Sequence, residues 1–72
     1  MKHKYQITIA WSAEDRCYLA YLPDFIDEIM QPVTYGATYQ EALQNAIEVM
    51  EELILALQAE GKPLPAIKLA SI

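Results

Sequence analysis

Cysteine, histidine and glycine are scarce in this chain, and each scarcity excludes a class of site. Cys17 is the only cysteine and His3 the only histidine, so no internal disulfide can form and a zinc site lacks ligands. Gly36 and Gly61 are the only glycines, which leaves no glycine-rich loop for a phosphate. Nucleophilic catalysis needs a base held beside the nucleophile, and we interpret Cys17 as a small core thiol and His3 as a solvated imidazole. We therefore predict a protein that is not an enzyme and holds no metal or cofactor.

Long apolar stretches and positive charge are also lacking. No stretch reaches the ~20 residues of a membrane span, and the start has no apolar segment of the kind found in signal peptides. Together with the single unpaired cysteine, this predicts a cytoplasmic protein without membrane contact. Five Lys and Arg stand against ten Asp and Glu, giving a net charge of −5. This balance disfavours direct binding to nucleic acid and favours attraction to a basic partner.

The length predicts a single small domain over residues 1–72. A chain this short buries only roughly 60% of the surface that its unfolded form exposes, so it folds with little margin. Hydrophobic residues nevertheless make up 54% of it. Since disulfides and metals are excluded, self-association is the remaining means of stabilisation, and we predict a homo-oligomer.

Alternating apolar residues predict three strands before a helix. Residues 4–11 place Tyr5 and Trp11 on the same face of a first strand, and a polar turn over 12–16 leads into a second strand over 17–22. Both faces of this second strand are apolar, which is typical of a sheet covered on both sides. One small helix can cover only one of them. A loop over 23–32 precedes a short third strand, residues 33–35.

The clearest local signal is a helix start at Thr38, which forms a capping box with Glu41. An apolar stripe follows at spacings of three and four, and Gly61 is placed to end the helix. Residues 66–72 are apolar and predict a short C-terminal edge strand. The fold class is therefore α+β: a three-stranded antiparallel sheet with one long helix on one face, in the order β-β-β-α-β. The predicted core consists of Tyr5, Ile7, Ile9, Trp11, Leu43, Ile47, Met50 and Ile54.

Acidic residues gather in the loop and along the helix, and no Lys or Arg occurs from residue 38 to residue 60. Two interpretations stay open for these acids: an ordinary solvated surface, or a surface that contacts a basic partner. An apolar residue within the acidic part of the helix, Leu55, favours contact. The residues predicted to face a partner are Asp24, Asp27, Glu28, Glu48, Glu51 and Glu52.

Five segments of the chain together resemble the HicB family of antitoxins: Tyr5–Ile7, Trp11–Asp15, Tyr18–Asp24, Gly36–Ala46 and Glu60–Pro65. The resemblance implies an α+β fold related to a truncated ribonuclease H-like core. It also implies that the chain binds and masks a small basic toxin of the HicA type, an RNA-cleaving protein, and assembles as a dimer or tetramer. Many members of this family add a C-terminal DNA-binding region that represses an operator.

The chain departs from the family pattern in two places. Residues 25–30 replace a turn that resembles Leu-Pro-Gly-Cys in the family, and no segment for DNA binding follows before Ile72. We therefore expect no operator binding by this chain. Two alternatives to the antitoxin function stay open. One is a homo-oligomeric interaction module without a toxin partner, and the other is a nuclease or other hydrolase that would need clustered acids to bind Mg²⁺.

Overall fold

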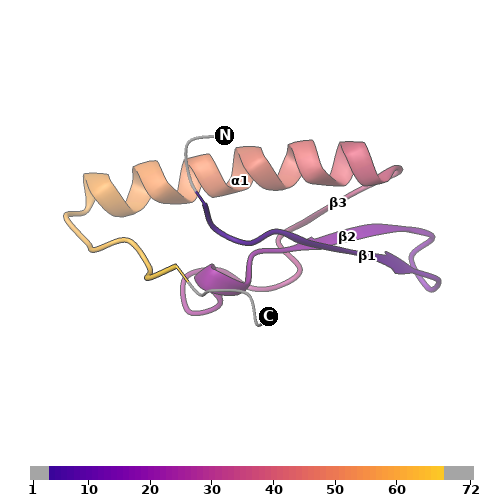
Figure 1. Ribbon diagram of the computed structural model, residues 1–72, viewed down its shortest axis with the longest axis horizontal. Coiled ribbons are helices and arrows are strands. Elements are labelled where there is room, and N and C mark those ends of the chain that lie inside the picture. Colours follow the sequence, from indigo (N-terminus) through magenta and orange to yellow (C-terminus); the bar gives the residue numbers. More distant parts are fainter. Residues whose placement is uncertain (1–3, 68–72) are drawn as a thin grey trace.

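A computed structural model describes residues 4–67 and shows one helix lying along one side of a small sheet (Figure 1). The three strands form one antiparallel sheet in the order β1-β2-β3, which confirms the predicted α+β class with a three-stranded antiparallel sheet and one long helix. Along the chain the elements are β1 (Thr8–Ser12), β2 (Cys17–Tyr21), the 3-10 helix η1 (Pro23–Phe25), β3 (Thr34–Gly36) and α1 (Tyr39–Ala59).

The first strand is shorter than predicted, because residues 4–7 leave the sheet. The backbone amide of Gln6 donates to the carboxylate of Asp24 at 3.0 Å, and the hydroxyl of Tyr5 donates to the carbonyl of Pro65 at 2.7 Å. These partners lie outside the sheet. The segment therefore crosses toward the helix and joins the strand pairing only at Thr8.

The predicted C-terminal edge strand is not present in the part of the chain that the structure describes. Ala66 and Ile67 belong to no strand, and the rest of the predicted strand, residues 68–72, lies outside the described residues. In the segment after α1, the carbonyl of Pro65 accepts a hydrogen bond from the side chain of Tyr5 and not from a neighbouring strand. Proline also lacks the amide proton that a ladder requires.

Both predicted ends of the helix are confirmed. At the start, Thr38 Oγ1 accepts a hydrogen bond from the amide of Glu41 at 3.0 Å, and Glu41 Oε1 accepts one from the amide of Ala37 at 2.9 Å. The end has the hydrogen bonds of a Schellman motif: the amide of Gly61 donates to Gln58, and the amide of Lys62 donates to Leu57. Gly61 has φ +72°, a conformation that favours glycine.

The core lies between α1 and the sheet. Tyr5, Met50 and Ile54 are buried as predicted, and Ile7 and Ile9 pack against the core. The predictions for Trp11 and Leu43 were wrong, since these side chains are 54% and 40% exposed. Four further buried residues lie on apolar faces that the sequence pattern indicated, although the predicted core did not include them: Ala20 and Leu22 on the second strand, and Ala46 and Leu57 on the helix. The pattern missed Phe25 and Ala42, which are also buried.

An offset of the helix toward β3 explains the two exposed side chains. α1 contacts β3 most and β1 least. A Cβ on Gly36 would lie 2.3 Å from the backbone nitrogen of Ala42, so the strand and the helix touch backbone to backbone. Because of this offset, Trp11 on β1 is only partly covered. Its ring packs edge-on against that of Tyr18, with the two ring centroids 5.0 Å apart. Leu43 is left partly exposed on the helix.

Candidate partner-binding surfaces

The side of α1 that faces away from the sheet carries an acidic ridge, which we define as Glu48, Glu51 and Glu52. All three side chains are exposed. At 100° per residue they fall opposite the buried positions of the helix, such as Ala46 and Met50. The amide of Gln44 donates to Glu48 at 3.3 Å, but none of the three acids forms an ion pair with any of residues 4–67. The negative charge of the ridge is therefore not neutralised within the described chain.

An exposed apolar side chain accompanies the ridge. Leu55 is 66% exposed and lies three and four positions after Glu52 and Glu51, so it stands on the same surface of the helix. A single exposed leucine is common on protein surfaces. Beside three unpaired acids, however, it adds an apolar contact point to a surface that otherwise offers only charge.

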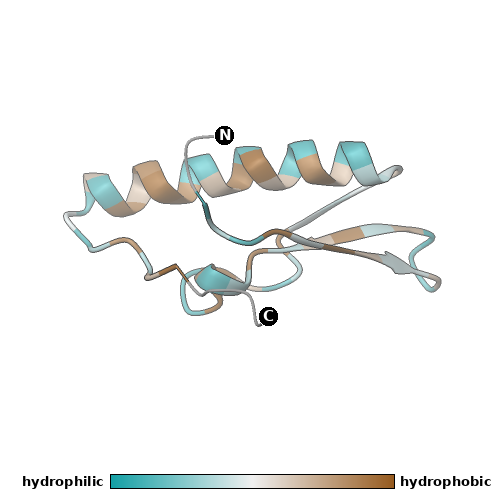
Figure 2. Cartoon of the chain, viewed as in Figure 1, coloured by the Kyte–Doolittle hydropathy of each residue, from teal (hydrophilic) through white to brown (hydrophobic). Residues whose placement is uncertain are grey.

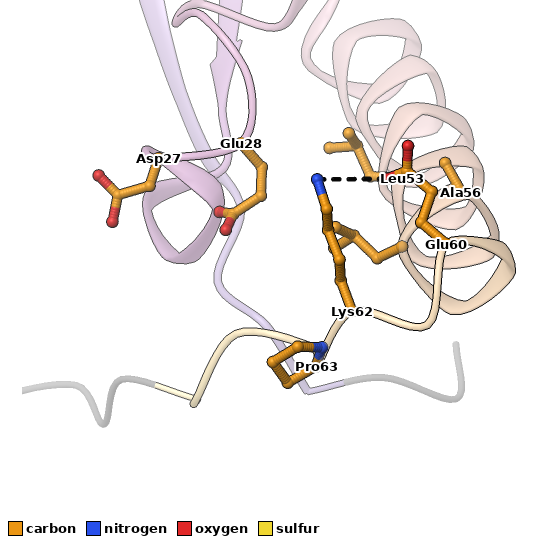
Figure 3. A pocket seen from close by; sticks show the side chains of 8 residues that line it. Asp27, Glu28, Leu53, Ala56, Glu60, Lys62 and Pro63 are labelled. Carbon is orange, nitrogen blue, oxygen red and sulfur yellow. Dashed lines mark ion pairs between the residues drawn. The ribbon is translucent and has the colours of Figure 1, made fainter.

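The loop acids Asp27 and Glu28 border a hollow of about 450 Å³ at the C-terminal end of α1 (Figure 3). In Figure 3, Glu28 faces the hollow while the carboxylate of Asp27 points away from it. Across the hollow, Lys62 Nζ pairs with Glu60 Oε1 at 3.5 Å. The four remaining lining residues are apolar: Leu53, Ala56, Leu57 and Pro63. The hollow therefore has an apolar floor and a rim of mixed charge, on which Glu28 is the acid that faces inward.

The prediction that Asp24 faces a partner does not fit its position. Asp24 lies in η1, is only 5% exposed, and its carboxylate accepts the amide of Gln6. It therefore positions the segment that leads into β1 and is not offered to another molecule. Its partner lies 18 positions away along the chain, a separation that gave no signal in the sequence pattern.

The other predicted acids fall on two separate parts of the surface, the ridge in the middle of α1 and the loop beside its end.

Among residues 4–67, no three Asp, Glu, Cys or His side chains are grouped as a metal site requires. The described residues therefore supply no ligand set for the Mg²⁺ that the hydrolase alternative needs. Helical periodicity was sufficient to find the ridge, whereas the hollow depends on packing between distant segments.

A second surface is the sheet face turned away from α1, which we call the open face: Ala10, Cys17, Leu19, Tyr21 and Tyr35. Ala10, Leu19 and Tyr35 lie side by side in the strand register. Ala20, on the opposite face of β2, is fully buried, whereas Tyr35 is 65% exposed. No helix in the described part of the chain covers the open face (Figure 1). The prediction that one helix leaves one side of β2 uncovered is confirmed.

The five residues of the open face are uncharged, but the register places Thr8 and Ser12 on the same side of the sheet. Asp15 borders the depression that Cys17, Leu19 and Tyr35 line. Figure 2 shows alternating hydrophobic and hydrophilic bands along α1 and mostly pale to hydrophobic positions in the strands. Two exposed side chains of the loop after β2 add to the apolar surface of the molecule: Ile26, 61% exposed, and Met30, 88% exposed. Ile26 borders a shallow depression together with Tyr21 and Thr8. The sequence pattern did not identify these loop residues, because the loop has no periodicity to read.

Comparison with protein-family models, with curated proteins and with solved structures found no match to this chain. The resemblance to HicB antitoxins therefore rests on the sequence motifs alone. Within residues 4–67, α1 does not combine the length and the apolar character that a membrane-spanning helix needs.

Proposed function

We propose that this chain is an antitoxin-like, protein-binding domain of the HicB type that binds and masks a small basic toxin of the HicA type. The single observation that carries the proposal is the acidic ridge. Glu48, Glu51 and Glu52 are exposed together on α1, and no cation of residues 4–67 pairs with them. A basic protein would supply the missing charges.

Like charges on the ridge oppose helix stability in the free chain. Glu48 and Glu52 are four positions apart, a spacing at which two negative charges destabilise a helix by about 0.2–0.5 kcal/mol. A basic partner placed against the ridge would relieve this repulsion. Exposed charges mainly accelerate association and select the partner, and contribute less to the final affinity. Contact with Leu55 would add apolar burial to the charge pairs.

The loop acids extend the same proposal to a second contact. Asp27 and Glu28 are exposed, and Glu28 faces the hollow beside the end of α1. A basic side chain entering this hollow would meet Glu28 over the apolar floor formed by Leu53 and Leu57, and would compete with Lys62 for Glu60. The ridge and the hollow both involve α1, so one partner lying along the helix could reach both.

Co-purification with a small basic protein encoded beside this chain, at low and then at high salt, tests the proposal. The wild-type complex should form at low salt and weaken as salt rises, because exposed charge pairs are screened. The ridge variant Glu51→Gln/Glu52→Gln should bind more weakly and depend less on salt. Its matched control is Glu14→Gln/Asp15→Asn, which removes two charges from the turn between β1 and β2.

Two results would contradict the proposal. One is the absence of any complex with a HicA-type toxin at low salt. The other is an equal loss of binding in the ridge variant and in the turn control, because this would show a response to net charge and not to the ridge. Asp15 shares a hydrogen bond with Ser12 at 3.0 Å, which asparagine can keep through its carbonyl oxygen, so the control should remain folded.

A second candidate function, a homo-oligomeric interaction module, is favoured by a different observation. The open face consists of uncharged residues, has Asp15 at its border, and is uncovered by any helix of the described chain. Self-association would bury it and would leave the acidic ridge exposed, so the two functions are compatible. A chain that sediments as a monomer at micromolar concentration and above would rule out this second function.

A further inference from the structure

We infer that a basic partner buries an aromatic strip beside the acidic ridge, and we define this strip as Trp11, Tyr18, Tyr39, Leu43 and Ile47. The inference rests on the proposed function and names the apolar centre of the contact. Trp11 is 54% exposed, Tyr39 60% and Leu43 40%, while Tyr18 and Ile47 are half-buried. Tryptophan and tyrosine are the side chains most often found to dominate the binding energy of an interface.

The three rings of the strip form one contiguous group, although they come from three elements. Trp11 and Tyr18 are direct partners in the register of β1 and β2, and their ring centroids lie 5.0 Å apart. The ring of Tyr18 in turn lies 4.1 Å from the ring of Tyr39, centroid to centroid, at the start of α1. In Figure 1 the start of α1 and the turn between β1 and β2 lie at the same end of the molecule. Because each ring contacts its neighbour, little side-chain freedom is lost when a partner covers them.

The offset of α1 toward β3 leaves the strip partly uncovered. Asn45 and Ile47 lie about 100° to either side of the buried Ala46. The side chain of Asn45 donates to the carbonyl of Tyr35 at 2.8 Å, so its flank of the helix faces β3. Ile47, with Leu43 four positions before it, therefore lies on the flank that faces β1.

One row of side chains along α1 joins the strip to the acidic ridge. Its members follow one another at spacings of four, which makes successive side chains neighbours on the helix surface: Tyr39, Leu43, Ile47, Glu51 and Leu55. Four residues turn a helix by about 400°, so the row winds from the sheet side at its start to the outer side at its end. The row is about 24 Å long. A partner that lies along it would cover the strip at one end and meet the ridge at the other.

The charges beside the strip favour a basic protein as its occupant. Two copies of this chain that met through their strips would place two acidic ridges at the border of one interface, where like charges repel. The phosphates of a nucleic acid would be repelled by the same acids. A basic protein instead covers the rings with apolar side chains and pairs its Lys and Arg with the ridge. An Arg guanidinium also stacks on the faces of Trp and Tyr rings.

Binding titrations of Tyr39→Ala and Tyr35→Ala with the small basic protein encoded beside this chain test the inference. Each variant removes one tyrosine ring without a change of charge. The two side chains are 60% and 65% exposed, but Tyr35 lies on the open face, on the other side of the sheet. Tyr39→Ala should raise the dissociation constant at least about tenfold, and Tyr35→Ala should bind like the wild type.

The salt dependence of binding distinguishes the strip from the ridge. Tyr39→Ala removes an apolar contact, so its affinity should fall with salt as steeply as that of the wild type. The ridge variant Glu51→Gln/Glu52→Gln removes charges and should show a shallower dependence. Circular dichroism checks that Tyr39→Ala is folded, which we expect because its side chain is mostly exposed.

A second measurement needs no substitution. Trp11 is the only tryptophan of the chain, so biosynthetic incorporation of fluorotryptophan gives a single fluorine NMR resonance, and it comes from the strip. An unlabelled partner contributes no signal. In the complex the resonance should move, and its shift between ordinary and heavy water should shrink because the ring leaves the solvent. A resonance that is the same in the free and the bound chain would overturn the inference.

The outcomes separate this inference from the proposed function. If Tyr39→Ala bound as tightly as the wild type, or if Tyr35→Ala lost as much affinity as Tyr39→Ala, the inference would be wrong. The proposed function would still stand if the ridge variant bound more weakly. The absence of any complex with the wild-type chain would refute the proposed function and the inference together.

Discussion

The hydroxyl of Tyr5 donates a 2.7 Å hydrogen bond to the carbonyl of Pro65, joining two residues 60 positions apart. The ring of Tyr5 also contacts Phe25 edge-on, with centroids 4.8 Å apart. One buried side chain thus holds the segment before β1 and the segment after α1 against the same core. Burial, and secondarily the negative charge of Asp24, raise the pKa of the Tyr5 hydroxyl above its ordinary value of 10.0.

Replacing Tyr5 with phenylalanine should lower the free energy of unfolding by about 0.5–1.5 kcal/mol at neutral pH. The ring and its contact with Phe25 are kept, so the loss reports the interactions of the hydroxyl, among them the hydrogen bond to Pro65. Urea denaturation of both proteins, with equal slopes, measures the difference. A Tyr5→Phe chain as stable as the wild type would show that water replaces the hydroxyl without loss.

Alkaline pH should destabilise the wild-type chain through the same residue. Because the pKa of Tyr5 is higher in the folded chain than in the unfolded chain, the stability it contributes is present below about pH 10 and lost as pH rises above that value. Between neutral pH and pH 11, the wild type should therefore lose more stability than Tyr5→Phe. Tyr39→Phe keeps Tyr5 and should follow the wild type. Parallel curves for the wild type and Tyr5→Phe would contradict this prediction.

The two glycines should respond to alanine by different amounts. Gly36→Ala would place a Cβ 2.3 Å from the backbone nitrogen of Ala42, so β3 and α1 would have to separate, at a cost of about 3 kcal/mol or more. Gly61→Ala meets nothing within 4 Å, but its φ of +72° strains an alanine by about 1 kcal/mol. Thermal unfolding should rank wild type, Gly61→Ala and Gly36→Ala in decreasing order. The reverse order of the two variants would show that β3 and α1 are not in close contact.

Local hydrogen bonding explains how much of the fold was predictable. Thr38 and Glu41 are three positions apart, and Gly61 follows the last turn, so the sequence alone indicated both ends of α1. The start of β1 was not predictable, because it depends on the distant partners Asp24 and Pro65. The exposure of Trp11 was equally hidden. Alternation predicts which face of a strand a residue occupies, but not how far a helix extends over that face.

The candidate surfaces were predictable to different degrees for the same reason. The acidic ridge follows from helical periodicity, and the structure leaves all three of its residues exposed. The uncovered side of β2 follows from its two apolar faces. The burial of Asp24 did not follow from either pattern. An irregular loop has no periodicity, so the sequence does not distinguish a buried, structural acid from an exposed one there.

Asp24 should prove important for folding and dispensable for partner binding. Asp24→Ala removes the acceptor of the Gln6 amide in a buried position and should reduce the free energy of unfolding by about 1–3 kcal/mol. Asp24→Asn keeps a carbonyl oxygen and should lose less. Chemical denaturation measures both. If the fraction of Asp24→Asn that is folded bound a basic partner more weakly than the wild type does, Asp24 would belong to the binding surface after all.

Glu52→Lys should make the free chain more stable and the complex weaker. The substitution removes the repulsion between positions 48 and 52 and creates an attractive pair with Glu48, which together should raise the free energy of unfolding by about 0.4–1 kcal/mol. It also places a positive charge on the ridge, where a basic partner would be repelled. Glu14→Lys changes the net charge equally, but lies in the turn after β1 and should alter neither the helix nor the ridge. Urea denaturation and a binding titration at low salt, made on all three chains, separate the two effects. Suppose that Glu52→Lys gains stability and still binds the partner as tightly as Glu14→Lys does. The ridge would then be only a solvated surface, because its like charges would destabilise the helix without strengthening the binding of a partner.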